Sequence, residues 1–562
     1  MAHDERRPSA SRFAGFTFHL PNVWSRQPHN GYAALPRDGD GGDEDHSAAA
    51  EHGAAVAERE GAMQHGAEAT DEWRQLSTVG RLCVYAAFGT LGAAVLLPFN
   101  TLITPSEYYR ALLAGSAYEA SFMSWIVLTY NAGTIIFGAH ATATLESTTP
   151  LRRMLRSGIT VLAALVLLAA YVFLHQLGPS VHAGDAAPKT PRADGQAVFP
   201  ALLAVAAVMA AATAYLQSAV VALSSTFGAR PMGLMLAGQG VVGVVVSLIQ
   251  LFATLAAQAE ARSAVALGHK VPDARLEARD SAVVFFTWSA VFMLLSLVVI
   301  VLLSRSALYR AVSARQARAR ELVSPAGAPL SVGSDPRTAG WEEGKGFGRY
   351  IPHSMRDGAA RIRSVQSQVI AMSVCIAWCF IVTIAVFPSL SSRVRPWPTA
   401  TPPEDEPRWR DPLVFVALHY VLFNAGDLVG RMLPTLLPRL FLLEARRAII
   451  FWSGMREGFL GLLPLCNVSH AAADTPGRRA VVAAVAVAAT AGRAARFGDA
   501  TFFALMVLLG LSNGVLSTSI FISGPKRPGV KEDERPLAAT IISFWLTVGL
   551  ALGSGASFLW AR

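Results

Sequence analysis

The chain has 562 residues, of which 52% are hydrophobic and only 15% are charged, and its mean hydropathy is positive. This composition excludes a string of ordinary soluble domains and indicates a membrane protein. The net charge of +9 is spread over short segments between apolar runs. That distribution favours an explanation by membrane topology over nucleic-acid binding.

Residues 1–79 lack the short apolar core of a secretory signal peptide and contain few large apolar side chains. This composition predicts a disordered, cytosolic N-terminal arm. Within it, "YAAL" at Tyr32 to Leu35 has the Tyr-x-x-bulky form of an endosomal sorting signal, although such tetrapeptides also arise by chance. The long arm and this tetrapeptide weakly favour an internal compartment as the location of the protein.

Eleven apolar stretches follow, each close to the roughly 20 residues that a helix needs to cross a hydrocarbon core. They run over residues 81–103, 119–141, 155–176, 199–226, 231–257, 281–304, 366–389, 412–437, 446–466, 499–523 and 537–560. The sequence therefore predicts an all-α integral membrane protein of six plus five spans. Transmembrane segments at 80–304 and 366–562 flank a basic cytosolic loop at 305–365, interpreted as a flexible linker.

The distribution of basic residues predicts the orientation of these spans. With the N-terminus in the cytosol, the inner connectors include "LRRMLR", the 305–365 loop with about eleven Lys or Arg, and "PKRPGVKEDER". The outer connectors are less basic, as the positive-inside rule requires. The apolar run within 478–499 is too short to span, so we expect an interfacial helix or an irregular insert there.

The eighth stretch contains two charges, Asp427 and Arg431, in "FNAGDLVGR". On a helix, a spacing of four residues places both side chains on one face, where they can neutralise each other. An unpaired charge at the middle of a bilayer costs about 3 to more than 10 kcal/mol. The pair is therefore either a lock between helices or a water-accessible site that binds a polar solute, and the sequence leaves both open.

Other polar residues lie within the apolar stretches and are candidates for a binding site or for helix packing. They are Asn100, Gln217, Gln239, Asn424 and Asn513. Amide side chains offer both donors and acceptors, so several of them facing one space would suit a neutral ligand with many hydrogen-bonding edges.

Small residues and prolines in the spans are interpreted first as packing features and helix starts. They include Gly233, Ala237, Gly238, Gly240 and Gly243, the Gly549 and Gly553 pair, Pro98 and Pro231. The four cysteines, Cys83, Cys375, Cys379 and Cys466, are predicted to be small core residues.

Motifs typical of enzymes are missing from the sequence. There is no G-x-x-x-x-G-K-[ST] phosphate loop and no H-E-x-x-H zinc motif, so neither ATP nor a metal or other cofactor is predicted. "AGD" is similar to the G-x-G-D of intramembrane aspartyl proteases, but Asn424 stands where that pattern needs glycine. Asn467-Val-Ser469 has the form of a glycosylation acceptor, yet it abuts a span, which favours an unmodified helix end.

Five stretches together resemble the equilibrative nucleoside transporter family, and they follow that family's order. They are "LLPFNTLIT" at 96–104, "PMGLMLAGQGVVGVVVSL" at 231–248, "FNAGDLVGR" at 423–431, "REGFLGLLPLCN" at 456–467 and "GLSNGVLSTSIFISGPKR…GLALGSGASFL" at 510–559. The resemblance implies a two-bundle fold like that of the major facilitators, in the plasma membrane or a vacuolar or lysosomal membrane. It implies transport of nucleosides, and sometimes nucleobases, by alternating access.

The same resemblance implies roles for individual residues. Gln217 matches the family glutamine that reads the base, and Asp427 and Arg431 match the pair around the ribose hydroxyls. Asn100 and Asn424 match asparagines near the site, while Gly238, Gln239 and Gly240 match a glycine-glutamine-glycine turn. Phe99 departs from the usual Trp: its ring still stacks on a base but lacks the indole N–H donor.

Two alternatives stay open at this point. A receptor or scaffold would bind a ligand without moving it, and composition alone does not separate a nucleoside from another small polar solute. The expected partners are nucleosides and the lipid bilayer, without nucleic acid or ATP. Protons are a candidate partner, since Glu119, His140 and Glu457 lie near span ends, where solvation also explains them.

Overall fold

A computed structural model describes Trp73 and residues 76–119, 121–174, 193–267, 274–323, 353–397, 407–468 and 497–561. The "YAAL" tetrapeptide, nearly all of the N-terminal arm and most of the 478–499 segment lie outside the described residues.

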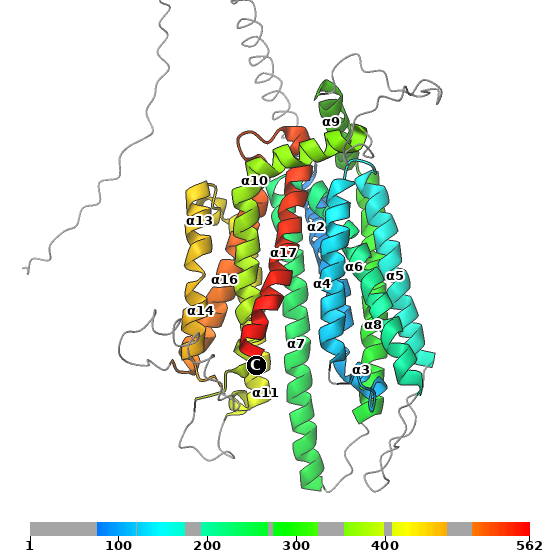
Figure 1. Ribbon diagram of the computed structural model, residues 1–562, viewed down its shortest axis with the longest axis vertical. Coiled ribbons are helices and arrows are strands. Elements are labelled where there is room, and N and C mark those ends of the chain that lie inside the picture. Colours follow the sequence, from blue (N-terminus) through cyan, green and yellow to red (C-terminus); the bar gives the residue numbers. More distant parts are fainter. Residues whose placement is uncertain are drawn as a thin grey trace, which may run out of the picture. The chain divides into compact units, whose positions relative to one another are not determined.

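The N-terminal half of the described chain is built from long helices that run back and forth (Figure 1). They are α2 (Thr78–Ile103), the short α3 (Ser106–Leu112), α4 (Phe122–Ala143), α5 (Pro150–Leu174), α6 (Ala193–Phe227), α7 (Ala229–Leu267) and α8 (Ala274–Arg305). After them, α9 (Ala307–Val323) forms helix inside the segment interpreted as a linker.

The C-terminal half begins with α10 (His353–Val386), which starts well before the predicted span at 366. It continues with α11 (Pro412–Leu436), α12 (Pro438–Phe441), α13 (Arg446–Met455), α14 (Gly458–Leu462), α16 (Asp499–Ser523) and α17 (Arg535–Ala561). The start of α11 follows ordinary capping rules, because the Asp411 carboxylate accepts the Leu413 N–H at 2.9 Å and proline occupies the first helical position.

Within the described residues, ten helices are long and apolar enough to cross a membrane. The ninth predicted span, at 446–466, differs from the prediction, because the chain divides there into α13 and α14. Around Arg456 the backbone N–H groups of Glu457, Phe459 and Leu460 bond to oxygens three residues earlier, which makes a tight turn. The buried side chain of Arg456 explains the break, since it bonds to two neighbouring helices.

Large apolar side chains on the outside of these helices are exposed. Leu167, Phe252 and Trp288 each expose 64% or more of their surface. Exposed apolar surface on long helices, whose backbone groups are satisfied internally, suits lipid rather than water. The protein is a multi-pass integral membrane protein. Of the four cysteines, Cys375, Cys379 and Cys466 are buried as predicted, whereas Cys83 is exposed.

Glycines allow several of these helices to approach closely. A Cβ on Gly238 of α7 would collide with the Gly89 backbone of α2, and one on Gly549 or Gly553 of α17 would meet the α10 backbone. Gly430 of α11 lies against the Leu511 backbone of α16 in the same way. These contacts place the helices near enough for side chains from four of them to meet at one site.

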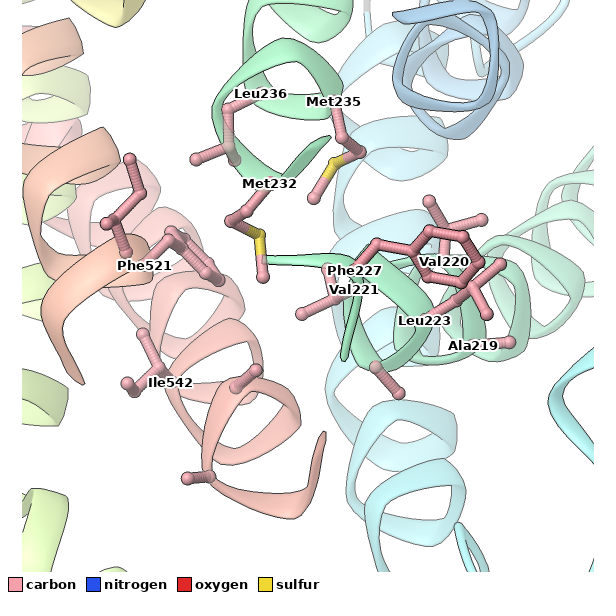
Figure 2. Packing of buried hydrophobic residues seen from close by; sticks show 14 of the residues in the cluster. Ala219, Val220, Val221, Leu223, Phe227, Met232, Met235, Leu236, Phe521 and Ile542 are labelled. Atoms are coloured by element: carbon pink, nitrogen blue, oxygen red, sulfur yellow. The ribbon is translucent and has the colours of Figure 1, made fainter. Parts of the chain in front are cut away.

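The apolar interior divides into three cores. The common core draws buried residues from both halves, among them Phe227, Met232, Leu236, Phe521 and Ile542 (Figure 2). The N-side core belongs to the N-terminal half alone, with Leu102, Ile126, Leu165 and Phe286 among its members. The C-side core belongs to the C-terminal half alone, with Phe415, Phe423, Leu463 and Phe502 among its members.

The common core lies at one end of the helices, and the other two cores lie at the opposite end. On α6, whose C-terminal end leads into α7, Met209 belongs to the N-side core, and Val220, nearer to that end, belongs to the common core. On α16, Leu509 belongs to the C-side core and Ile520 to the common core. Because α9 contributes Leu308 to the common core, we call this end of the molecule the loop end.

Candidate functional site

Asp427 and Arg431 lie on one face of α11, one turn apart. The Nε–H of Arg431 donates to Oδ2 of Asp427 at 2.7 Å, and the residues are only 7% and 6% exposed. The predicted self-neutralising pair is therefore confirmed as a structural feature. Its burial makes the contact a charge-assisted hydrogen bond in a poorly solvated place rather than a screened surface ion pair.

Arg431 also reaches across to the N-terminal half. Its Nη1 donates to the Leu236 carbonyl oxygen at 3.2 Å and to Oε1 of Gln239 at 3.3 Å, both on α7. A Cβ on Gly240 would lie 3.3 Å from Cδ of Arg431, so the glycine leaves room for the arginine stem. One guanidinium thus ties the two halves together.

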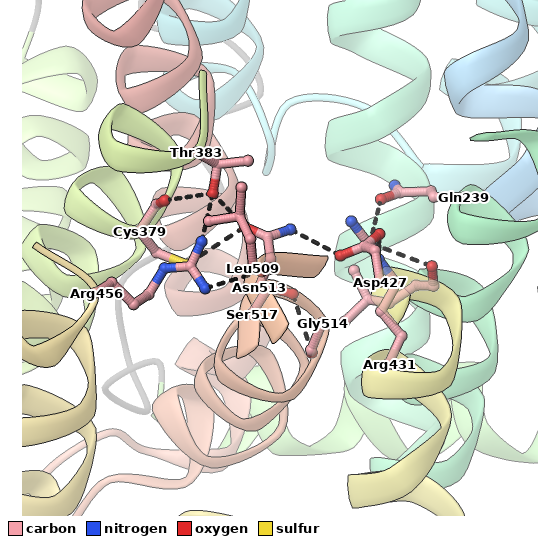
Figure 3. Close-up of polar contacts among 11 residues, drawn as sticks. Gln239, Cys379, Thr383, Asp427, Arg431, Arg456, Leu509, Asn513, Gly514 and Ser517 are labelled. Atoms are coloured by element: carbon pink, nitrogen blue, oxygen red, sulfur yellow. Dashed lines mark hydrogen bonds and ion pairs between the residues drawn. The ribbon is translucent and has the colours of Figure 1, made fainter. Parts of the chain in front are cut away.

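The other oxygen of Asp427 is held from within the C-terminal half. Asn513 of α16 donates from Nδ2 to Oδ1 of Asp427 at 2.7 Å (Figure 3). The Asn513 carbonyl oxygen in turn accepts the Thr383 hydroxyl of α10 at 2.8 Å. Thr383 also accepts a hydrogen bond from Nη2 of Arg456 at 2.6 Å, so a continuous polar chain runs from Arg456 to α7.

This network holds two guanidiniums and one carboxylate among the described residues. Arg456 is 2% exposed, and its partners besides Thr383 are the Leu509 carbonyl oxygen and the Ser512 hydroxyl. Buried charges in a membrane protein are costly unless neutralised or fully hydrogen-bonded. Such a cluster is therefore a candidate functional site.

The other predicted site residues are placed around this network but do not join it. Gln217 of α6 donates from Nε2 to the Ser543 hydroxyl of α17 at 2.8 Å, which is a second polar link between the halves. The amides of Asn424 and Asn100 each donate to a carbonyl one turn earlier in their own helix. Phe99 of α2 packs on Tyr130 of α4, with ring centroids 5.1 Å apart.

Of the residues predicted for gating or packing, Gln239 and Gly240 of α7 lie at the interface between the halves, whereas Gly238 packs on α2 and Gly549 and Gly553 of α17 pack on α10. Gln239 contacts Arg431, and the glycine-glutamine-glycine segment expected to form a turn is continuous helix within α7. Pro231 is buried near the start of α7, where Gly233 lies against Thr435 of α11. Gly243 lies close to Asn424, since a Cβ there would be 2.6 Å from the amide oxygen.

The polar residues form a layer between the apolar cores. On α16, Asn513 falls between Leu509 of the C-side core and Ile520 of the common core. On α10, Thr383 falls between Phe380 of the common core and Val386 of the C-side core. On α11, Asp427 follows Phe423 of the C-side core, so the layer lies part-way along the helices.

Sequence reasoning missed Thr383 and Arg456. A threonine inside an apolar span carries no signal, because its hydroxyl is usually satisfied by its own helix. Arg456 does carry one, since it is an arginine inside a stretch that was predicted to span. Asn513 stands out in the sequence as a polar residue within a span, but nothing there indicates that Asp427 is its partner.

An all-helical membrane protein with a polar layer between two halves and one interrupted span has the architecture of a solute transporter. The chain belongs to the nucleoside transporter family, whose sequence model, described as "Nucleoside transporter", matches residues 203–562. Membership in this family assigns the chain to transporters rather than enzymes.

Similar proteins agree with that assignment. Human equilibrative nucleoside transporter 2 is 24% identical over 499 residues, covering 84% of this chain and 95% of the relative. Mouse equilibrative nucleoside transporter 1 is 26% identical over 510 residues, covering 85% and 96%. Among solved structures, the partially occluded, inward open xylose transporter XylE from E. coli covers 85% of this chain and 91% of its own, with 11% identity. The TM-score is 0.42, too low to decide the fold.

Proposed function

We propose that the protein carries nucleosides across a membrane by alternating access, with Asp427 and Arg431 as the centre of the substrate site. The observation that carries this proposal is the position of the pair in the polar layer between the two halves, where Arg431 bonds to both. A pair at this position can contact a solute held between the halves and can exchange its partners on α7 for that solute when the halves move.

The chemistry of a nucleoside fits the predicted residues. Its ribose hydroxyls both donate and accept, so they can donate to Asp427 and accept from Arg431. Gln217 offers an amide that can read the edge of a base, and Phe99 offers an aromatic face for stacking. Asn100 and Asn424 add further donors and acceptors, and all four of these side chains are partly accessible.

The packing of the two halves supports alternating access. In this structure the halves share the common core at the loop end, where Nη1 of Arg361 on α10 also pairs with Oε1 of Glu146 at 2.6 Å. To release substrate at the loop end, the common core has to part and this ion pair has to break. Following the positive-inside rule, we place the loop end in the cytosol, so the common core closes the cytosolic side of the molecule.

The nucleoside gradient alone drives transport in this proposal. No phosphate loop is present in the sequence, which argues against hydrolysis of ATP by this chain. Both oxygens of Asp427 accept hydrogen bonds, and the charged groups near it are Arg431 on its own helix and Arg456 between α13 and α14. We therefore propose equilibrative exchange, and uptake with and without a pH gradient tests it against proton coupling.

Uptake of uridine and adenosine into proteoliposomes tests the function. We expect saturable uptake by the wild type and a loss of about tenfold or more in Asp427→Asn and Arg431→Ala, because each change removes a charge-assisted hydrogen bond. Arg110→Ala is the matched control, since Arg110 forms an exposed pair with Glu107 outside the polar layer. Unchanged uptake in both site variants would refute the assignment.

Two further measurements separate the alternatives. Saturable nucleoside binding without flux into vesicles would favour a receptor or scaffold. Repeating the uptake with and without an inward pH gradient distinguishes the mode of transport: we expect the same rate in both conditions. An initial rate that rises several-fold with the gradient would favour proton coupling. Sugars and nucleobases in the same panel test the substrate class.

A further inference from the structure

Arg456 is the most deeply buried charge in the described part of the chain that the proposed function leaves without a role. It lies at the break between α13 and α14, and it is 2% exposed. Its hydrogen bonds go to neutral oxygens, and its Nε has no hydrogen-bond partner among the described residues. Interrupting a span to bury an arginine is costly, so a specific benefit has to offset it.

Arg456 donates to the Thr383 hydroxyl, which has a single proton and can therefore donate to only one acceptor at a time. Because Arg456 donates to Thr383, the oxygen of this hydroxyl is occupied as an acceptor. Its single proton has two acceptors at 2.8 Å, the Asn513 amide oxygen and the Cys379 carbonyl oxygen of its own helix, and in this scheme it points at Asn513. The Asn513 amide then has its oxygen towards Thr383 and its nitrogen towards Asp427. The reversed amide would set its oxygen against the carboxylate, which is repulsive.

We propose that Arg456, acting through Thr383 and Asn513, is a positioning residue that fixes the orientation of the Asp427 carboxylate towards the ribose hydroxyls. This inference rests on the proposed function and deepens it, because it names a determinant of selectivity for ribose over deoxyribose. Arg456 and Thr383 do not touch substrate in this scheme.

The hydrogen bonds that lead from Arg456 to Asp427 lie within one half of the molecule, which explains how the orientation of the Asp427 carboxylate survives the transport cycle. Arg456, Thr383 and Asn513 all belong to the C-terminal half, as does Asp427 on α11 (Figure 3). The hydrogen bonds from Arg431 to α7 join the two halves, so they change when the halves move relative to each other. The bonds behind Asp427 do not cross, so its carboxylate keeps one orientation in both states.

A pair of substitutions at Thr383 tests the proposal without touching the substrate site. Thr383→Val removes the hydroxyl at nearly constant volume, whereas Thr383→Ser keeps it. Thr540→Val is the matched control, because Thr540 is equally buried and its hydroxyl bonds only to the Pro536 carbonyl of its own helix. The readout is the ratio of KM values for uridine, 2′-deoxyuridine and 3′-deoxyuridine in proteoliposomes.

We expect Thr383→Val to reduce the preference for uridine over the deoxy analogues by about threefold to tenfold, the effect of one buried hydrogen bond. Thr383→Ser and Thr540→Val should keep the wild-type ratio. A purely structural role would lower the maximal rate for all three substrates and leave the ratio unchanged, and that result in Thr383→Val would overturn the proposal.

Arg456→Lys provides a second test if Thr383→Val does not yield folded protein. Lysine keeps the charge but loses the planar fork that reaches Thr383, Ser512 and the Leu509 carbonyl together. The same shift in the ratio is expected, and an unchanged ratio counts against the proposal. Absence of nucleoside uptake by the wild type would instead refute the proposed function, so the two failures are distinguishable.

Discussion

The two ends of the helix bundle are packed in different ways. At the loop end, residues from both halves form one common core, whereas at the opposite end the N-side core draws on the N-terminal half alone and the C-side core on the C-terminal half alone. The polar layer lies where the three meet. The halves therefore share apolar packing at the loop end and polar contacts in the layer, and beyond the layer each half packs on its own core. This is the arrangement expected of a carrier that is closed on one side.

Locking the loop end should produce the largest effect. Glu146→Cys combined with Arg361→Cys places two thiols where an ion pair now joins the halves. In a Cys83→Ser background, which removes the exposed native thiol, a short bifunctional thiol reagent should abolish uptake, and a cleavable version should restore it on reduction. Full turnover by the cross-linked protein would show that this end does not open.

Single-cysteine variants are the control for that experiment, because they react with the reagent but cannot join the halves. They should retain uptake after treatment.

Replacing a glycine by alanine should cost more stability at a contact within one half than at a contact between the two halves. Gly430→Ala forces a Cβ into the Leu511 backbone inside the C-terminal half, where two helix backbones would have to separate. We expect a loss of about 3 kcal/mol, seen as a lower Tm in detergent. In Gly243→Ala the three atoms nearest to the new Cβ belong to the Asn424 side chain, whose amide can rotate away, so we expect a loss below about 1 kcal/mol.

Equal losses at the two glycines would argue that the contact between the halves is as rigid as the contact within one. Gly358→Ala serves as the reference, since a Cβ there meets nothing within 4 Å.

The smallest effect is expected from the ion pair at the loop end. Arg361 is 29% exposed and Glu146 is 42% exposed, so solvent screens the contact and it contributes about 1 kcal/mol or less. Arg361 also pairs with Asp533 of its own half, so Glu146→Ala is the variant that removes only the contact between the halves. It should raise alkylation of Ile542→Cys, a position buried in the common core, by about twofold to fivefold. Glu107→Ala should leave the labelling rate unchanged, and a rate unaffected by Glu146→Ala would exclude the pair as a latch.

Local patterns in the sequence were sufficient for the helices and for one contact in the site. Apolar runs predicted the membrane-spanning stretches because a span has to be apolar along its whole length. The spacing of Asp427 and Arg431 predicted their ion pair because both lie on one helix, whose geometry is regular.

Contacts between distant segments could not be predicted in the same way. Asn513 and Asp427 are 86 residues apart, and Arg456 and Thr383 are 73 apart. Whether they meet depends on which faces of α10, α11 and α16 pack together, and the apolar pattern of a span does not record that. Counting apolar residues also passed over the break at Arg456, because the flanking side chains are apolar enough to suggest a continuous span.

The composition of the common core has a thermal consequence. Parting the halves at the loop end brings apolar side chains such as Met232, Leu236 and Phe521 into contact with water. Wetting apolar surface raises the heat capacity of the system. The step that opens the loop end therefore raises the heat capacity until apolar surface is buried elsewhere, and its activation enthalpy changes with temperature. A plot of the logarithm of the transport rate against reciprocal temperature should curve rather than follow a straight line.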